Sequence, residues 1–183
     1  MGLKDFFGKK SGESIDPLKD LTLSKLKPGY IIDYDMKTWQ VTAYNKYEFE
    51  DGYKAEEWGL NSGDEICYLE RSEDDEVEWS LSKKIPIGAI EGDIRKYIID
   101  NDDPPAKLVY KGKTYYLEES GPGYFYEGGN EPGKEFIYWE FIDEADKHFI
   151  SIEQWGETEF EAAEGFAVEE YQFTNILPGE KSV

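Results

Sequence analysis

The chain has 183 residues, a formal net charge of −21 at pH 7 and an aromatic content of 16%. That length suffices for one good-sized domain or two small ones that share a core. An acidic chain without a fold would be poor in aromatic residues, so the composition predicts a folded protein, and its aromatic side chains favour β-strands. The negative charge repels the phosphates of nucleic acids, so no nucleic-acid partner is predicted.

The charge is unevenly distributed along the sequence. Residues 1–30 carry six lysines against four acids, whereas residues 118–180 carry seventeen acids against two lysines, a balance of −15. The sequence therefore predicts an acidic face that binds a basic protein surface, because complementary charge selects partners and speeds their encounter. The alternative is an acidic surface that only maintains solubility.

The sequence also bears on where the protein resides. Cys67 is the single cysteine, so no internal disulfide can form, which is typical of a reducing cytoplasm. No apolar run approaches the ~18–20 residues that span a bilayer, and the first ten residues lack the apolar core of a signal peptide. A cytoplasmic protein is predicted, with peripheral attachment to a membrane as the alternative.

Residues 1–17 are predicted to form a flexible basic tail that ends at Pro17. Its candidate docking side chains, for a membrane surface, a membrane protein or a partner's groove, are Leu3, Phe6, Phe7, Lys9 and Lys10. The alternative is a frayed terminus, because short isolated helices are only marginally stable in water.

From Gly29 onward, short runs that alternate apolar and polar residues lie between turn signals, which predicts β-strands. The predicted strands cover residues 30–34, 38–44, 53–60, 65–70, 77–81, 135–142, 148–155, 158–161 and 166–173. One helix is predicted over residues 91–100, where Ile94, Tyr97 and Ile98 share one helical face. The two prolines that follow at 104 and 105 end it.

The pattern of the first half returns in the second. The run from Asp35 to Val41 matches the run from Lys111 to Leu117, and both contain Lys-Thr followed by an aromatic residue. The sequence therefore predicts a mainly β fold with a duplicated antiparallel β unit, in which two related meander or barrel-like halves pack together with one short helix between them. The predicted boundaries are 1–17 for the tail, 18–103 for the first unit and 104–183 for the second.

Several of these runs resemble an uncharacterised bacterial family, number four-one-seven-eight among the domains of unknown function. The resemblance covers about residues 20–180, and the runs that carry it are Leu26-Lys-Pro-Gly-Tyr30, Trp58 with its neighbours, Lys113-Thr-Tyr-Tyr, Tyr138-Trp-Glu-Phe141, and Ile152-Glu-Gln-Trp-Gly156 with Glu161 and Gly165. It implies a genomic context of membrane stress, near relatives of phage shock protein A, small membrane proteins and polyamine-synthesis enzymes. It brings no catalytic residue.

Catalytic and metal-binding signatures are not found. The only histidine, His148, is predicted to lie at a surface turn, and Cys67 is predicted to be a small buried hydrophobe. One cysteine and one histidine cannot build a zinc site, and the acidic runs lack the spacing of a calcium loop. No catalytic residue, metal or cofactor is therefore predicted, and the protein is expected not to be an enzyme.

Two classes of function remain open. The first is a non-enzymatic adaptor that holds a protein partner, and the second is a binder of, or enzyme for, a cationic (polyamine-like) or carbohydrate ligand. The second class rests on acids beside aromatic residues, a pattern that suits cations over ring faces and glycosidase-like carboxylate pairs. The candidate binding residues are Trp58, Tyr138, Trp139, Glu140, Glu153 and Trp155. If these side chains converge on a concave pocket, the second class gains; if the tryptophans form the core and the acids splay into solvent, the first does.

Overall fold

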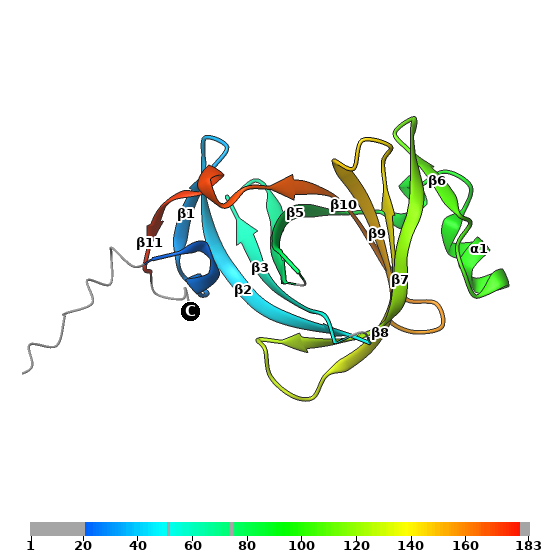
Figure 1. The fold of residues 1–183 in the computed structure, drawn as a ribbon, viewed down its shortest axis with the longest axis horizontal. Helices are drawn as coiled ribbons and strands as arrows, with labels where there is room; N and C mark the ends of the chain where they lie inside the picture. The colour runs from blue at the N-terminus through cyan, green and yellow to red at the C-terminus, as the bar shows by residue number, and fades with distance from the viewer. Residues whose placement is uncertain (1–20, 51, 74, 180–183) are drawn as a thin grey trace, which may run out of the picture.

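The computed structural model describes residues 21–50, 52–73 and 75–179, and it confirms a mainly β fold (Figure 1). In the first half the strands are β1 (Ile31–Tyr34), β2 (Lys37–Phe49), β3 (Lys54–Asn61), β4 (Ile66–Glu73) and β5 (Val77–Ile85). In the second half they are β6 (Lys107–Tyr110), β7 (Lys113–Glu127), β8 (Lys134–Ile142), β9 (His148–Gln154), β10 (Phe160–Val168) and β11 (Thr174–Leu177). The predicted basic tail lies outside the described residues.

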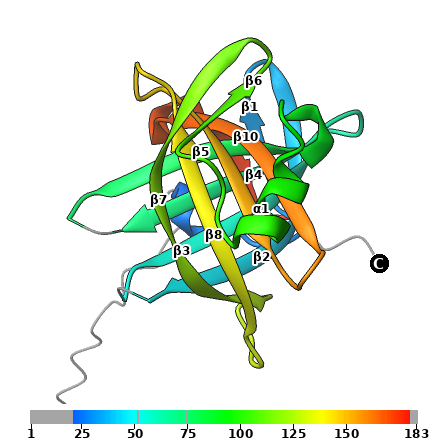
Figure 2. The same cartoon turned by 90° about the vertical axis from the view of Figure 1, so that its right-hand side faces the viewer.

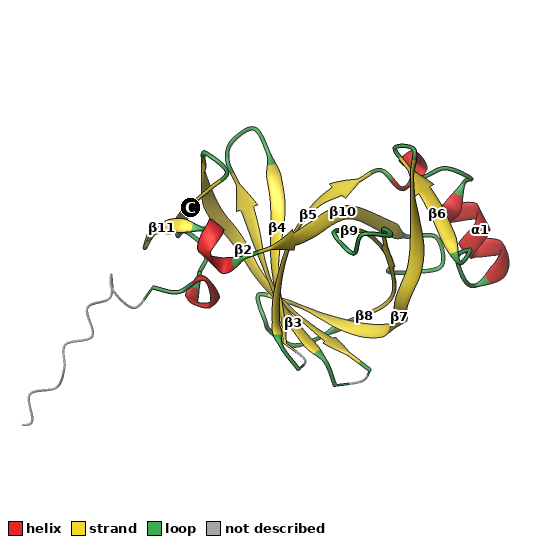
Figure 3. Cartoon of the chain, turned by 45° about the horizontal axis from the view of Figure 1, so that its top comes forward, coloured by secondary structure: helices red, strands yellow, loops and turns green. Residues whose placement is uncertain are grey.

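The strands form one antiparallel sheet that closes on itself. Its order is β11-β1-β2-β3-β4-β5-β10-β9-β8-β7-β6, and an additional pairing joins β2 to β7. Strands β2 to β5 and β7 to β10 therefore make a ring, which Figure 3 shows as an open circle, while β1 with β11 and β6 extend beyond it. The ring closes where residues 45–49 of β2 pair with residues 123–127 of β7.

The two hydrophobic cores lie on the outer side of the ring. The first core packs Trp58 and Leu60 of β3 against Leu23, Leu26 and Ile32 of the segments that precede β2. The second core is covered by α1 and β6, as Figures 1 and 2 show, and its members include Ile94, Ile98, Leu108, Trp139, Phe141, Ile150 and Ile152. Since side chains alternate between the two faces of a strand, the opposite, more polar face of the same strands turns toward the inside of the ring.

The predicted helix is α1 (Ile94–Asn101), which begins where the Asp93 side chain accepts a hydrogen bond from the backbone N–H of Lys96. Ile94 and Ile98 are buried as expected, whereas Tyr97 lies at the margin of that face and is 42% exposed. Three short 3-10 helices also occur: η1 (Leu23–Lys25), η2 (Ile87–Ala89) and η3 (Glu170–Gln172). No helix within the described ranges is long and apolar enough to cross a membrane.

The prediction of separate strands at residues 158–161 and 166–173 was wrong. A single strand, β10, runs through the supposed break, then η3 follows, and β11 pairs with β1. The residues between the two predicted strands belong to β10 and pack closely: a Cβ atom on Gly165 would lie 2.2 Å from the ring of Phe149 on the neighbouring strand β9. A glycine inside a strand can mark such a close approach as well as a break.

The two halves share further features beyond the order of their strands. Lys37, at the start of the long strand β2, contacts Glu65 at 2.6 Å in the loop between β3 and β4. Lys113, at the start of the long strand β7, contacts Asp143 at 2.9 Å in the loop between β8 and β9. The repeated Lys-Thr-aromatic run thus makes the same kind of contact twice, which supports the duplication, although the duplication itself stays a prediction.

Candidate functional site

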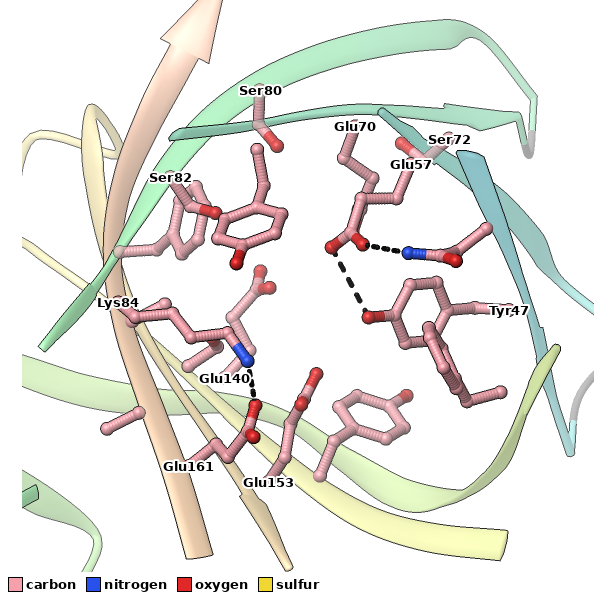
Figure 4. Close-up of a pocket in the computed structure, with 18 of the residues that line it drawn as sticks. Tyr47, Glu57, Glu70, Ser72, Ser80, Ser82, Lys84, Glu140, Glu153 and Glu161 are labelled. Atoms are coloured by element: carbon pink, nitrogen blue, oxygen red, sulfur yellow. Dashed lines mark hydrogen bonds and ion pairs between the residues drawn. The ribbon is translucent and has the colours of Figure 1, made fainter. Parts of the chain in front are cut away.

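A cavity of about 1700 Å³ lies inside the ring, and both halves of the chain line it. Figure 4 shows the labelled side chains of β2, β3, β4, β5, β8, β9 and β10 pointing toward one another across this space. The inward face is polar because the apolar face of each strand is taken up by the outer cores. The interior of the ring is therefore a cavity large enough to admit solvent, and not a packed core.

Besides Glu161, which forms an ion pair with Lys84, four carboxyl groups labelled in Figure 4 point into this cavity, one from each of four strands: Glu57 on β3, Glu70 on β4, Glu140 on β8 and Glu153 on β9. Glu57 and Glu70 lie directly opposite each other in the β3–β4 pairing. Like charges at directly opposed positions of neighbouring strands destabilise a sheet. The fold therefore holds several negative groups close together in a space that protein walls enclose.

The environment raises the pKa of all four carboxyls. Desolvation raises the pKa of Glu70 to about 8, and the negative charges of Glu57, Glu140 and Glu153 add to the effect. Desolvation likewise raises the pKa of Glu140 and of Glu153 to about 7. Burial also raises the pKa of Glu57, while hydrogen bonds from Asn45 and Tyr47 oppose that rise. Near neutral pH the cluster thus holds protons that free carboxyls would release.

The partners of these carboxyls differ. Glu57 accepts hydrogen bonds from Asn45 Nδ2 at 2.9 Å and from the Tyr47 hydroxyl at 3.3 Å. Glu70 and Glu140 make no hydrogen bond or ion pair with any residue that the structure describes, and the neighbouring charges that act on their pKa are all carboxylates. The Glu70 side chain is partly buried, and it lines the cavity. Among the described residues Glu70 is therefore a cavity-facing carboxyl without a partner.

Three basic side chains along the cavity have partners other than Glu70 and Glu140. Lys84 forms an ion pair with Glu161 (Figure 4), and its charge also opposes the rise in the pKa of Glu57 and Glu153. Lys134 lies over the indole ring of Trp155, 4.8 Å from its centroid. Arg95 donates a hydrogen bond to the backbone carbonyl of Thr158. No basic side chain that the structure describes forms an ion pair with Glu70 or Glu140.

Aromatic rings gather at the seam where β2 meets β7. A cluster of Tyr47, Ala55 and Phe136 is packed against Phe49, Phe125, Tyr138 and Trp155, and of these rings Phe136 stacks on Trp155 at a centroid distance of 4.8 Å. The indole Nε1 of Trp155 is buried without a well-formed hydrogen bond, although the indole lies near enough to Glu153 to oppose the rise in the pKa of that carboxyl. The site thus combines carboxylates with ring faces, which suits an organic cation.

A family model described as "Domain of unknown function (DUF4178)" matches residues 27–170, which include all the carboxyls that line the cavity. The chain belongs to this family. A relative of the chain, an uncharacterized protein of Aquifex aeolicus (strain VF5), is 29% identical to it over 176 residues, and the match covers 96% of each chain. No solved structure matches the chain.

The structure divides the predicted binding residues of this DUF4178 protein into two groups. Tyr138, Glu140, Glu153 and Trp155 line the cavity. Trp58 and Trp139 instead lie on the opposite faces of their strands in the outer cores, and each is at most 1% exposed. The predicted docking residues of the tail, Leu3, Phe6, Phe7, Lys9 and Lys10, fall outside the described residues.

The cavity is also lined by four residues that were not predicted from the sequence: Glu57, Glu70, Lys84 and Tyr47. A signal was present, because Glu57 precedes Trp58 and Glu70 follows Leu69, so each acid alternates with a core residue along its strand. That alternation is equally typical of a strand whose polar face meets bulk solvent. Only the closure of the ring brings the acids together.

Two other residues were considered for catalysis, His148 and Cys67, and the structure gives both of them contacts that are typical of a structural role. The His148 side chain is 48% exposed, and its Nδ1 lies 3.0 Å from the Asp143 carboxylate, which also accepts the backbone N–H groups of Lys147 and His148. Cys67 is buried in the first core, and burial raises the pKa of its thiol to about 12. Among the described residues, no three of the histidine, cysteine and acidic side chains are placed to hold one metal ion together.

Proposed function

We propose that this protein binds an organic cation inside the ring of strands. The observation that carries the proposal is Glu70, a partly buried carboxyl with no hydrogen-bond or ion-pair partner among the described residues, which faces the cavity beside three further carboxyls. The convergence of Glu140, Glu153 and Trp155 on the same cavity supports the ligand-binding class of function over the adaptor class.

The physical reason is the cost of confining like charges. Moving an ionised carboxyl out of water is unfavourable unless an opposite charge accompanies it. In the empty cavity protons fulfil this role, because the raised pKa values of Glu70, Glu140 and Glu153 keep these groups partly neutral near pH 7. A cationic ligand would supply the missing charge directly and would also cover ring faces of the aromatic cluster.

A catalytic pair of carboxyls is supported less well. Acid and base roles in glycoside hydrolysis require two neighbouring carboxyls whose environments separate their pKa values, so that one is protonated while the other is ionised. Here desolvation raises the pKa of Glu140 and Glu153 to about 7 alike. A neutral sugar would also leave the charge of the cluster uncompensated. Binding of a cation therefore accounts for more of the observed features of the site than glycoside hydrolysis does.

The test is a calorimetric titration of the full chain with small primary amines at about pH 8, with glucose as a neutral contrast. We expect amines to bind and glucose not to bind. We expect Glu70→Gln to weaken amine binding at least tenfold, since hydrogen bonds to charged groups contribute roughly 1.5–3 kcal/mol. The matched control is Glu91→Gln, which removes the same charge from an exposed position outside the cavity. Equal amine affinity in the wild type and in Glu70→Gln would refute the proposal.

Binding of a basic protein surface stays a separate prediction, since residues 118–180 carry a charge of −15 and many of these acids lie on the outer surface. Contacts between exposed charges are screened by salt. Capture of a basic partner should therefore weaken from low to high salt, and removal of residues 1–17 should reduce any association with membranes. If capture of the partner does not change with salt concentration, the acidic exterior serves solubility alone.

A further inference from the structure

The carboxyls of the cavity come from both halves of the ring. Glu57 and Glu70 belong to adjacent strands of the first half, and Glu140 and Glu153 belong to adjacent strands of the second. The two pairs face each other across the cavity (Figure 4). A ligand with one charge could compensate one pair but would leave the other pair with only the charge of Lys84, which Glu161 shares.

We propose that the ligand is a flexible aliphatic chain with at least two ammonium groups, one held at Glu57 and Glu70 and another at Glu140 and Glu153. This inference rests on the proposed function and narrows it from organic cations in general to linear di- and polyammonium ions. An ammonium group carries several N–H donors, so one can bond both Glu57 and Glu70, which are directly opposed. Another can lie between Glu140 and Glu153, which occupy diagonal positions on β8 and β9.

The dimensions and lining of the cavity agree with an extended ligand. Its volume of about 1700 Å³ far exceeds that of a single ammonium group. The walls of the cavity also carry rings and hydroxyls, among them Tyr47, Tyr53, Ser80, Ser82 and Ser151. Methylene groups between the charges can lie on the rings, and further nitrogen atoms can bond the hydroxyls.

A compact divalent metal ion fits the same residues less well. Metal ions such as Ca²⁺ and Mg²⁺ need several oxygen ligands within about 2.6 Å of one centre. Among the described residues no group of three potential ligands is arranged in that way. The four carboxyls are instead spread over two opposite walls, so two separate positive charges match them better than one concentrated charge.

The decisive measurement compares three probes of equal chain length, namely 1,4-diaminobutane, n-butylamine and 1,4-butanediol, by calorimetry at about pH 8. We expect the diamine to bind at least tenfold more tightly than the monoamine, and the diol not to bind. A further series from 1,3-diaminopropane to 1,6-diaminohexane should show an optimal length, because only one separation of nitrogens matches the two carboxyl pairs.

Two variants link the probes to the residues. Glu70→Gln and Glu140→Gln should each abolish the advantage of the diamine, so that it binds like a monoamine, whereas Glu91→Gln should retain it. Circular dichroism spectra confirm that each variant is folded. If the monoamine binds as tightly as the diamine, the inference fails and the proposed function stands. If no amine binds, both fail, and if Mg²⁺ alone binds at these carboxyls, the cavity is a metal site instead.

Discussion

Replacing Glu70 by Gln should stabilise the empty protein at about pH 9 by about 2–4 kcal/mol, and should change its stability little at about pH 5. The pKa of this carboxyl is raised from its ordinary value of 4.5 to about 8, chiefly by desolvation. Each unit of raised pKa corresponds to about 1.4 kcal/mol between the two protonation states. Glutamine has nearly the same shape but never ionises, so it avoids the cost of an enclosed charge.

The sign of this effect follows from proton linkage. Between about pH 4.5 and about pH 8 the folded protein retains a proton on Glu70 that the unfolded chain has already lost. Raising the pH through this window therefore favours unfolding, and the stability contributed by the protonated group is lost as the pH passes the folded pKa. Glu140 and Glu153 act in the same direction, up to about pH 7.

Urea denaturation followed by tryptophan fluorescence at about pH 5, 7 and 9 measures this difference. Glu91→Gln is the control, because it lowers the net negative charge equally at an exposed position. The prediction is contradicted if Glu70→Gln and Glu91→Gln shift the free energy of unfolding by the same amount at every pH. Measurements should be made without amine buffers, since a bound amine would stabilise the wild type by mass action.

Local patterns in the sequence were sufficient to predict most strands and the helix. The hairpin of β1 and β2 was predicted from alternation on both sides of a polar turn, and α1 from the spacing of Ile94 and Ile98 before a pair of prolines. These elements are encoded within about ten residues of sequence. The strand β10 was divided into two predicted strands, and the sequence alone does not show that Gly165 inside it makes room for Phe149.

The ring and its site could not be predicted in the same way. Closure depends on the pairing of Asn45 with Glu127 and of Phe49 with Gly123, more than 70 residues apart in sequence. Without that pairing, Glu57 and Glu70 would be ordinary acids on the polar face of a sheet. The prediction that Trp58 and Trp139 mark a binding surface gave too much weight to residue type, since the outer cores take up both indoles.

The binding of 1,4-diaminobutane should release protons from the cavity. At about pH 7 the raised pKa values of Glu70, Glu140 and Glu153 leave these carboxyls partly protonated. Ammonium groups titrate near pH 10, as lysine does, so the ligand arrives fully charged. Its charges replace the protons, and affinity should therefore rise at least tenfold between about pH 6 and about pH 8, where at least one proton is exchanged per ligand.

Calorimetry in two amine-free buffers of different ionisation enthalpy, phosphate and cacodylate, measures the number of protons directly, because the buffer absorbs those released. Other charged groups act on the cluster, since Glu161 with Lys84 lies beside Glu153, and Glu78, Glu118 and Glu119 act on Glu140. Glu70→Gln should lower the number of protons released, because it removes the carboxyl with the most strongly raised of the three pKa values, whereas Glu91→Gln should leave that number unchanged.

Binding heats that are equal in both buffers, together with an affinity that does not depend on pH, would mean that the carboxyls are already ionised in the empty cavity. The protein would then have to stabilise their charges by means other than protons, which would contradict the absence of any partner for Glu70 among the described residues.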